Sequence, residues 1–241
     1  MNQNQSLKNK VAIIVCASSG MGRATAVAFA NDGARLVLAS RNEAALDSLS
    51  QELDGQTLVC PTDACQRQEV DRLIEQALSA FGRIDILVYA TGTNIPNRSL
   101  EKLDHETWDM MVSTNLTGAF NCTKAVLPTM EKQEDGLIIY ISSISVTRAD
   151  VSGVSYQASK HGLSGLAHGT FVERKEKGIR TTVIFPGLCD TPLVLQRPIK
   201  THEDVLAKAL QPQDVADACL YVATAPRRAR IGELTLQPTE L

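Results

Sequence analysis

Short apolar runs and helix-like segments alternate along the whole chain of 241 residues. The first run, residues 10–17, is rich in β-branched side chains and predicts a strand. A glycine turn and an alanine-rich helix that ends at Asn31-Asp32-Gly33 follow it. The same unit then recurs, with strands predicted at 35–40, 57–60, 84–90, 136–141, 180–185 and 233–236, and helices at 43–53, 68–81, 104–130, around Tyr156 and at 212–223.

This alternation predicts an α/β fold, because it buries a parallel sheet between two layers of helices. Seven strands and six helices would form one domain over residues 1–241, a doubly wound seven-stranded parallel sheet with helices on both faces. Ligands of such sheets bind at the carboxyl ends of the strands. The glycine turn, Gly92, Ser143 and Pro186-Gly187 all follow predicted strand ends, and residues 197–203 form a predicted loop or lid beside them.

The glycine turn reads Ser18-Ser19-Gly20-Met21-Gly22 and enters a helix. Its backbone N–H groups and the helix dipole would face an anion, as the pyrophosphate of a dinucleotide requires. Glycine-rich turns also occur simply because a chain turns tightly. The position after the first strand of an alternating pattern favours the dinucleotide interpretation.

Tyr156 and Lys160 stand four residues apart in a helix-like segment. Residues at that spacing share a helix face, so both would project into one cleft. A nearby ammonium favours the phenolate and lowers the pKa of the phenol. Ser143, at the end of the preceding strand, would donate to the same substrate oxygen. An exposed helix pair is the plain alternative, and the accompanying motifs favour proton transfer at a carbonyl or alcohol.

With these motifs the chain resembles the short-chain dehydrogenase/reductase family, with its Rossmann fold, from about Leu7 to Leu236. The resemblance implies a catalytic tetrad at Asn115, Ser143, Tyr156 and Lys160. It implies that Tyr156 is the acid and base, that Ser143 orients the carbonyl, that Lys160 holds the nicotinamide ribose and lowers the pKa of the tyrosine, and that Asn115 positions a water. The implied cofactor-binding residues are Ser18, Ser19, Gly20, Met21, Gly22, Ser40, Arg41, Asp63, Ala64, Ala90, Gly92, Tyr156, Lys160, Pro186, Gly187 and Thr191, and no metal is implied.

Two segments depart from the family pattern. Val15-Cys16 replaces the Thr-Gly that opens the glycine turn. If the missing glycine had a positive φ, Cys16 would cost about 1 kcal/mol or more; if the glycine only left room, Cys16 would fill space beside the cofactor. Tyr89-Ala90-Thr91-Gly92 replaces Asn-Asn-Ala-Gly, so the amides that brace the sheet are absent and Thr91 would replace them in part.

The second predicted strand ends Ala39-Ser40-Arg41 and lacks the carboxylate that accepts from a free ribose 2′-hydroxyl. Arg41 would pair with a 2′-phosphate, and Ser40 adds a hydroxyl. The sequence therefore favours NADP(H) over NAD(H). The alternative interpretation is that Arg41 is an ordinary solvated side chain between a strand and a helix. An NAD-linked alcohol-oxidising enzyme differs only in this residue.

Composition narrows the partners. A net charge of −3 with both signs interspersed offers no basic stripe for nucleic acid or anionic lipid. No apolar run reaches the ~20 residues of a membrane helix. The polar start Met-Asn-Gln-Asn-Gln-Ser lacks the apolar centre of a signal peptide, so a cytoplasmic protein is expected. The six cysteines and four histidines show no metal-ligand spacing and are expected to be free thiols and packing or surface residues.

The substrate is a small carbonyl or alcohol compound of open identity. The predicted cleft walls, residues 94–98, 144–154 and 188–200, are mixed in character, and Arg148, Arg197 and Lys200 are expected to be solvated rather than bound to an anionic tail. Ala158, Gly162, Gly165 and Gly169 form a stripe of small residues that either packs on the chain itself or forms a helix pair in a homodimer or homotetramer. The alternative function is a nucleotide-sensing or scaffolding protein with weak or no catalysis.

Overall fold

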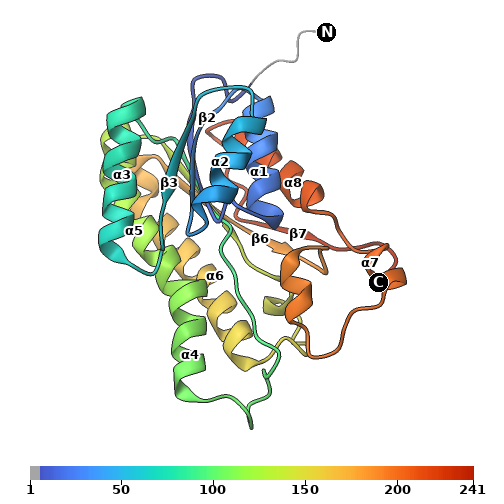
Figure 1. Cartoon of the computed structure of the whole chain (residues 1–241). Helices are drawn as coiled ribbons and strands as arrows, with labels where there is room; N and C mark the ends of the chain where they lie inside the picture. Colours follow the sequence, from blue (N-terminus) through green and yellow to red (C-terminus); the bar gives the residue numbers. More distant parts are fainter. Residues whose placement is uncertain (1–5) are drawn as a thin grey trace.

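The structure is a computed structural model that describes residues 6–241; residues 1–5, on which the expected lack of a signal peptide largely rests, lie outside it. Its centre is a parallel sheet of seven strands in the order β3-β2-β1-β4-β5-β6-β7 (Figure 1). The predicted doubly wound architecture is therefore confirmed. The strands are β1 (Val11–Val15), β2 (Arg35–Ser40), β3 (Thr57–Pro61), β4 (Ile86–Tyr89), β5 (Gly136–Ile141), β6 (Ile179–Pro186) and β7 (Glu233–Leu236).

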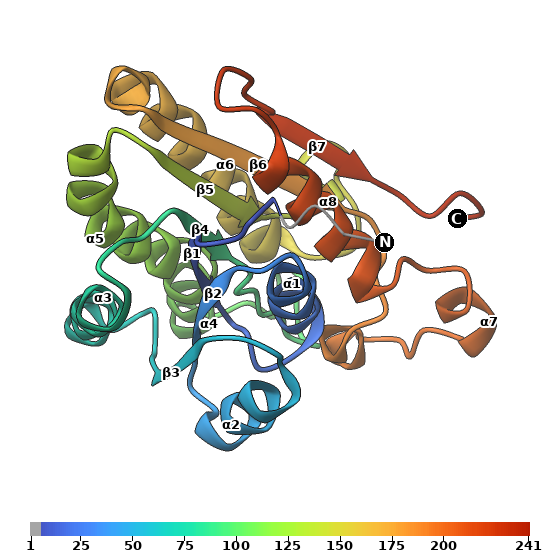
Figure 2. The ribbon, with the colours of Figure 1, turned by 90° about the horizontal axis from the view of Figure 1, so that it is seen from above.

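Helices cover both faces of the sheet, as Figure 2 shows from above. On one face lie α3 (Arg67–Phe81), α5 (Gly118–Gln133) and α6 (Val154–Arg174); on the other lie α1 (Gly20–Asn31), α2 (Glu43–Glu52) and α8 (Pro212–Thr224). The short elements are α4 (His105–Val112), η1 (Ser113–Thr117), η2 (Ile144–Val146), η3 (Lys175–Lys177), η4 (Pro192–Gln196) and α7 (Glu203–Leu206).

The two core layers follow from the period-two alternation of the strands. In β1, Val11, Ile13 and Val15 pack beneath α3, α5 and α6, whereas Ala12 and Ile14 pack beneath α1, α2 and α8. Every residue of β1 is buried, as expected of a strand covered on both sides.

One predicted helix is interrupted by a π-helical turn that the sequence did not predict. The segment predicted as a single helix over 104–130 is α4, a π-helical turn η1, and α5, which continues to Gln133. Asp104 caps its start by accepting from the Thr107 N–H at 2.7 Å. A π turn inserts one extra residue in the helix, which periodicity alone does not reveal.

The strand order reverses between β1 and β4, since β1 leads outward to β2 and β3 while β4 leads to β5, β6 and β7. In doubly wound sheets ligands bind at the carboxyl edge of this point. The turn after β1 and the loops after β4, β5 and β6 open on that edge. Residues 197–202 form the predicted loop beside it, and Glu203 already begins α7.

The small-residue stripe of α6 divides into two parts. A Cβ on Gly162 would overlap Leu116 of the same chain, so internal packing explains this glycine. A Cβ on Gly165 or Gly169 would meet no atom within 4 Å, and Val172, on the same stripe, is 66% exposed. Within residues 6–241, none of the helices has both the length and the apolar character needed to cross a bilayer.

Candidate active site

Tyr156 and Lys160 lie in the first two turns of α6, where both side chains are buried. The Lys160 Nζ atom is 6.0 Å from the centre of the Tyr156 ring. It donates to the carbonyl oxygens of Thr91 at 3.2 Å and Ile141 at 3.0 Å. An ammonium has three donors, so one remains for the pocket that Lys160 lines.

The charges around Tyr156 differ from those predicted. Burial raises the pKa of the Tyr156 hydroxyl; hydrogen bonding with Ser143 and the positive charge of Arg98 lower it, and Asp150 raises it further. Arg98 is therefore a cation acting on the phenol that the sequence did not indicate, since it assigned this role to Lys160 alone. Burial also lowers the pKa of Lys160 to about 8, which weakens it as a source of positive charge.

Ser143 follows β5 and caps the short helix η2. Its hydroxyl oxygen accepts from the Ser145 N–H at 3.2 Å and from the Ser145 hydroxyl at 2.9 Å. Because the oxygen is the acceptor in both bonds, its own hydrogen is available to donate toward the pocket.

Asn115 is completely buried in the π turn. Its side chain accepts from the Thr93 N–H at 2.8 Å and donates to the Thr93 carbonyl at 3.1 Å and to the Ser159 hydroxyl at 3.0 Å. The amide thereby fixes the loop after β4 to α6, on which Tyr156 and Lys160 lie. Local π turns often occur at functional sites because the extra residue re-aims a side chain.

The turn after β1 requires glycine at two positions. Gly20 has a φ of +53°, and a Cβ on Gly22 would overlap the carbonyl oxygen of Cys16. Cys16 itself has a φ of +69°, a conformation that costs a residue with a Cβ about 1 kcal/mol or more. Of the two explanations offered by the sequence for the missing glycine, the positive-φ one is correct.

Tyr89 replaces the absent amide brace after β4. Its buried hydroxyl donates to the carbonyl oxygen of Thr114 at 2.7 Å and interacts with the side chain of Thr91. The phenol thus connects β4 directly to the π turn. The sequence assigned part of this role to Thr91 but none to Tyr89.

Three adjoining pockets follow the carboxyl edge of the sheet, and each is named here by one residue. The Arg41 pocket, about 560 Å³, and the Lys160 pocket, about 380 Å³, share Cys16 and Ser19. The Arg98 pocket, about 110 Å³, adjoins the Lys160 pocket through Tyr156 and Thr191. Together they form a continuous groove from β2 to the loop after β6.

Most of the expected site residues line this groove. Ser18, Ser19, Ser40, Arg41, Asp63 and Ala64 line the Arg41 pocket; Ser19, Gly20, Met21, Ala90, Gly92, Tyr156, Lys160 and Thr191 line the Lys160 pocket; Met21, Ser143, Tyr156, Pro186, Gly187 and Thr191 line the Arg98 pocket. Gly22 and Asn115 are buried beneath the groove and line none of the three.

The Arg41 pocket contains one acid that the sequence analysis did not consider. Glu43 lines the pocket in the first turn of α2, two residues after Arg41. Arg41 is exposed and has no carboxylate within 4.0 Å among residues 6–241. The Ser40 oxygen accepts from the Asn42 N–H at 3.2 Å, which orients the hydroxyl.

A dinucleotide fits the residues of this groove. The amino end of α1 opens at the boundary of the Arg41 and Lys160 pockets, where Gly22 keeps the chain close-packed. The buried Lys160 has a free donor in the next pocket, and a Cβ on Gly92 would lie only 3.0 Å from its Nζ atom. The groove therefore has the N–H groups of the amino end of α1 at its middle, and side-chain hydrogen-bond donors on either side of them.

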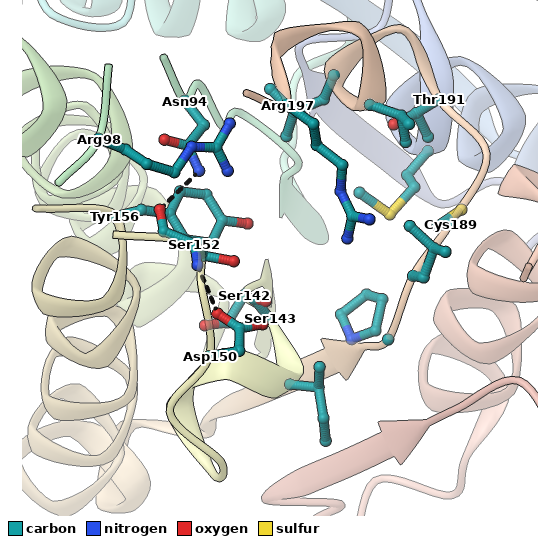
Figure 3. A pocket seen from close by; sticks show the side chains of 17 residues that line it. Asn94, Arg98, Ser142, Ser143, Asp150, Ser152, Tyr156, Cys189, Thr191 and Arg197 are labelled. Atoms are coloured by element: carbon teal, nitrogen blue, oxygen red, sulfur yellow. Dashed lines mark hydrogen bonds between the residues drawn. The ribbon is translucent and has the colours of Figure 1, made fainter. Parts of the chain in front are cut away.

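Sequence reasoning missed the importance of Arg98 and Asp150, although both lay within the predicted cleft walls. Arg98 is buried, while Asp150 is exposed at the rim of the same pocket (Figure 3). No local pattern identifies a buried arginine in a loop, because its burial depends on a contact with residue 196 of η4.

The cysteines and histidines take up structural positions. All six cysteines are free, and Cys60, Cys122, Cys189 and Cys219 are buried. His161 bonds to the Gln157 carbonyl at 2.7 Å, and His168 to Glu233 at 2.7 Å, both at the surface. In the part of the chain that the structure describes, no group of three or more His, Cys, Asp or Glu side chains is arranged to hold a metal ion.

A family of known proteins matches most of the chain. The family described as short chain dehydrogenase matches residues 10–201. An uncharacterized oxidoreductase of Staphylococcus aureus (strain MRSA252) is 34% identical over 233 residues, which cover 96% of this chain and 98% of the relative. A similar uncharacterized oxidoreductase of Staphylococcus haemolyticus is 34% identical over 235 residues, with the same coverage.

Solved structures show the same fold with nucleotides bound. An alcohol dehydrogenase from the archaeon Thermococcus sibiricus, complexed with 5-hydroxy-NADP, has a TM-score of 0.87 and 28% identity, over 96% of this chain and 97% of that one. A 3-ketoacyl-(acyl-carrier-protein) reductase from Brucella melitensis, complexed with NADH, has a TM-score of 0.89 and 26% identity, over 97% and 98%.

Proposed function

Because the chain belongs to the short-chain dehydrogenase family of oxidoreductases, we propose that it transfers a hydride between NADP(H) and a carbonyl or secondary alcohol, with Tyr156 as acid and base. One observation carries the proposal: Tyr156 and Ser143 line the same pocket, which adjoins the one lined by Lys160, and Ser143 acts to lower the pKa of the Tyr156 hydroxyl. These are the groups that a hydride transfer at a C–O bond needs.

Each residue has a distinct task in the direction of reduction. Tyr156 donates its proton to the substrate oxygen, and Ser143 donates a hydrogen bond that holds this oxygen in place. The third N–H of Lys160 would be available to the ribose hydroxyls of a bound cofactor, while Asn115 keeps α6 fixed against the loop after β4. The bound cofactor supplies the hydride. In oxidation Tyr156 takes the proton back.

The preference for NADP(H) over NAD(H) is part of the proposal. Arg41 has no acid partner within 4.0 Å in the described chain and lines the pocket at the end of β2, where a 2′-phosphate would lie. Glu43 in the same pocket opposes that preference. Arg41 carries the argument, since its guanidinium can reach a phosphate through two parallel N–H bonds.

The remaining expectations stay proposals. The substrate is a small carbonyl compound or alcohol, with no nucleic acid or membrane as a partner, and the protein acts in the cytoplasm. Gly165, Gly169 and Val172 leave an open, partly apolar stripe on α6, which supports assembly into a homodimer or homotetramer.

The test is a titration of the purified protein with NADPH and NADH, followed by a carbonyl panel monitored by the loss of nicotinamide absorbance. NADPH should bind more tightly, and at least one carbonyl should be reduced. The strained turn at Cys16 supports the rival proposal, a sensor or scaffold of the same fold. Nucleotide binding without turnover of any carbonyl or alcohol would favour that rival.

A further inference from the structure

Two arginines border the pocket into which the Tyr156 hydroxyl faces. Arg98 comes from the loop after β4 and Arg197 from the loop after η4, and both line the Arg98 pocket together with Ser143. In Figure 3 the guanidinium of Arg197 points into the centre of the pocket and Arg98 lies beside Tyr156. The inference drawn from this pair rests on the proposed function, because it concerns the substrate of that site.

Arg98 is a buried charge without an acid partner. It is 8% exposed, and its guanidinium donates only to main-chain carbonyls, from Nε to Ile95 at 2.8 Å and from one Nη to Gln196. No carboxylate of residues 6–241 lies within 4.0 Å of it. Burial and then the charge of Arg197 lower its pKa. A desolvated guanidinium of this kind is costly unless an anion meets it.

Arg197 adds a second positive charge to the same pocket. It is exposed, and its guanidinium donates to the Thr201 hydroxyl at 3.2 Å. The sequence predicted a solvated side chain, and exposure agrees with that. Its guanidinium nevertheless points into the centre of the pocket, where it is close enough to Arg98 for its charge to lower the pKa of that arginine.

One acid lines the pocket, but it does not neutralise the pair. The Asp150 carboxylate accepts from the Ser152 N–H at 2.8 Å and is exposed at the rim. It forms no ion pair with Arg98 or Arg197 at 4.0 Å or less, within the described residues. Two cations against one anion leave the pocket with a net positive charge next to the reacting oxygen.

We propose that the substrate carries a carboxylate, so that the reaction interconverts an oxo acid and the corresponding hydroxy acid. Arg98 and Arg197 bind the carboxylate, and the ketone oxygen lies between Tyr156 and Ser143. The carbonyl carbon accepts a hydride from reduced nicotinamide and its oxygen accepts the Tyr156 proton, while the nicotinamide becomes oxidised. A pocket of about 110 Å³ suits a short acid, and guanidinium groups bind carboxylates through paired charged hydrogen bonds.

The experiment compares acids with their own neutral esters. With NADPH in excess, kcat/KM is measured for 2-oxobutanoate, 4-oxopentanoate and 5-oxohexanoate, each beside its methyl ester. At least one acid should exceed its ester by about tenfold or more, since a charged hydrogen bond of about 1.5 kcal/mol corresponds to that factor. Arg197→Gln should lower this ratio and Arg197→Glu should reverse it.

Two further variants serve as controls. Asp150→Asn removes the opposing charge and should raise the acid-to-ester ratio. Arg148→Gln removes an exposed arginine that does not line the pocket and should leave the ratio unchanged. Arg197 carries the test rather than Arg98, because Arg98 also bonds Gln196 and its replacement can disturb folding.

Binding without turnover is measured separately, by calorimetry of pentanoate and pentanamide. Pentanoate should bind more tightly, and Arg197→Gln should abolish the difference. If esters are reduced as well as acids and pentanoate has no advantage, the carboxylate inference is wrong while the proposed function stands. If pentanoate binds through Arg197 but no carbonyl is reduced, the two arginines still form a carboxylate site, but the proposed function is wrong and the oxo-acid reaction with it. If neither occurs, both fail.

Discussion

The Lys160 ammonium lies 6.0 Å from the centre of the Tyr156 ring, one turn further along α6, and bonds two main-chain carbonyls instead of the phenol. The two side chains thus share a face but not a direct contact. Lys160 is fastened to the loop after β4 and to the end of β5, and Tyr156 faces Ser143. Their separate partners allow each residue to be tested alone.

Replacing Tyr156 by Phe should remove turnover while leaving the fold and nucleotide binding close to those of the wild type. General acid–base catalysis contributes about 10²–10⁴ to a rate, so kcat should fall by that factor on any good substrate. Steady-state kinetics and circular dichroism measure both effects. Tyr221→Phe is the matched control, because this tyrosine is 63% exposed and lines none of the three pockets. A Tyr156→Phe enzyme with unchanged kcat would rule out the assignment.

Lys160 should make stability depend on pH above neutrality. Its pKa is about 8 in the folded protein and 10.5 in its ordinary state, so between these values the unfolded chain binds more protons. The free energy of unfolding should therefore increase by about 3 kcal/mol in total as pH rises through that range, because the penalty for burying the charged Lys160 is relieved. Below pH 8 both states are protonated and the penalty of burial is complete.

Urea unfolding of the wild type and of Lys160→Met between pH 7 and 10 measures the contribution of Lys160 to the free energy of unfolding. The comparison is needed because burial raises the pKa of several cysteines, such as Cys60 and Cys219, and those thiols act in the opposite direction at high pH. The free energy of unfolding of the wild type, relative to that of Lys160→Met, should increase as the pH rises. A constant difference would contradict the prediction.

Cys16→Gly should stabilise the protein by up to about 1 kcal/mol, because glycine adopts a φ of +69° without strain. The greater conformational entropy of glycine in the unfolded chain offsets part of this gain. Cys16→Ala keeps the strain and should resemble the wild type. Cys16→Val should be the least stable, because β-branched residues are especially unfavourable at positive φ. Denaturant midpoints give the order. Equal midpoints for Gly and Ala would show that the turn is not strained.

Arg41→Ala should weaken NADPH binding by about tenfold at low ionic strength and affect NADH little. Glu43→Gln should change the preference in the opposite direction, because it removes the acid from the same pocket. Dissociation constants from nucleotide fluorescence titrations measure both variants. If Arg41→Ala weakens NADPH and NADH equally, Arg41 does not read the 2′-phosphate.

Gly165→Glu should lower the mass of the assembly in solution. The added side chain meets no atom of its own chain within 4 Å of its Cβ, and glutamate favours helix, so the protomer should remain folded. Light scattering after size-exclusion chromatography measures the mass. Gly162→Ala is the contrasting variant: its Cβ overlaps Leu116, so it should reduce stability without dissociating the oligomer. A monomeric wild type would refute the interface.

The sequence predicted the site residues best where the regular geometry of a helix or a parallel sheet determines their positions. Tyr156 and Lys160 were placed together because four residues are one helical turn, and Ser143 and Gly187 because parallel strands end at one edge. Arg98 escaped prediction because its burial depends on a carbonyl 98 positions away. The conformation of Cys16 remained a choice between strain and space until its φ was known, and the brace from Tyr89 depends on the unpredicted π turn.

That π turn makes the length of one helix critical. α4 packs against α6, while α5 packs against β4 and β5, and the π turn Ser113–Thr117 joins the two. Deleting one residue there would replace the wide turn by regular α-helical winding, so that the side chains of the turn would change direction. Asn115 would then point away from Thr93. A one-residue deletion, harmless in most surface loops, should here disconnect the groove from its support, so natural variation in this region should occur by substitution rather than by change of length.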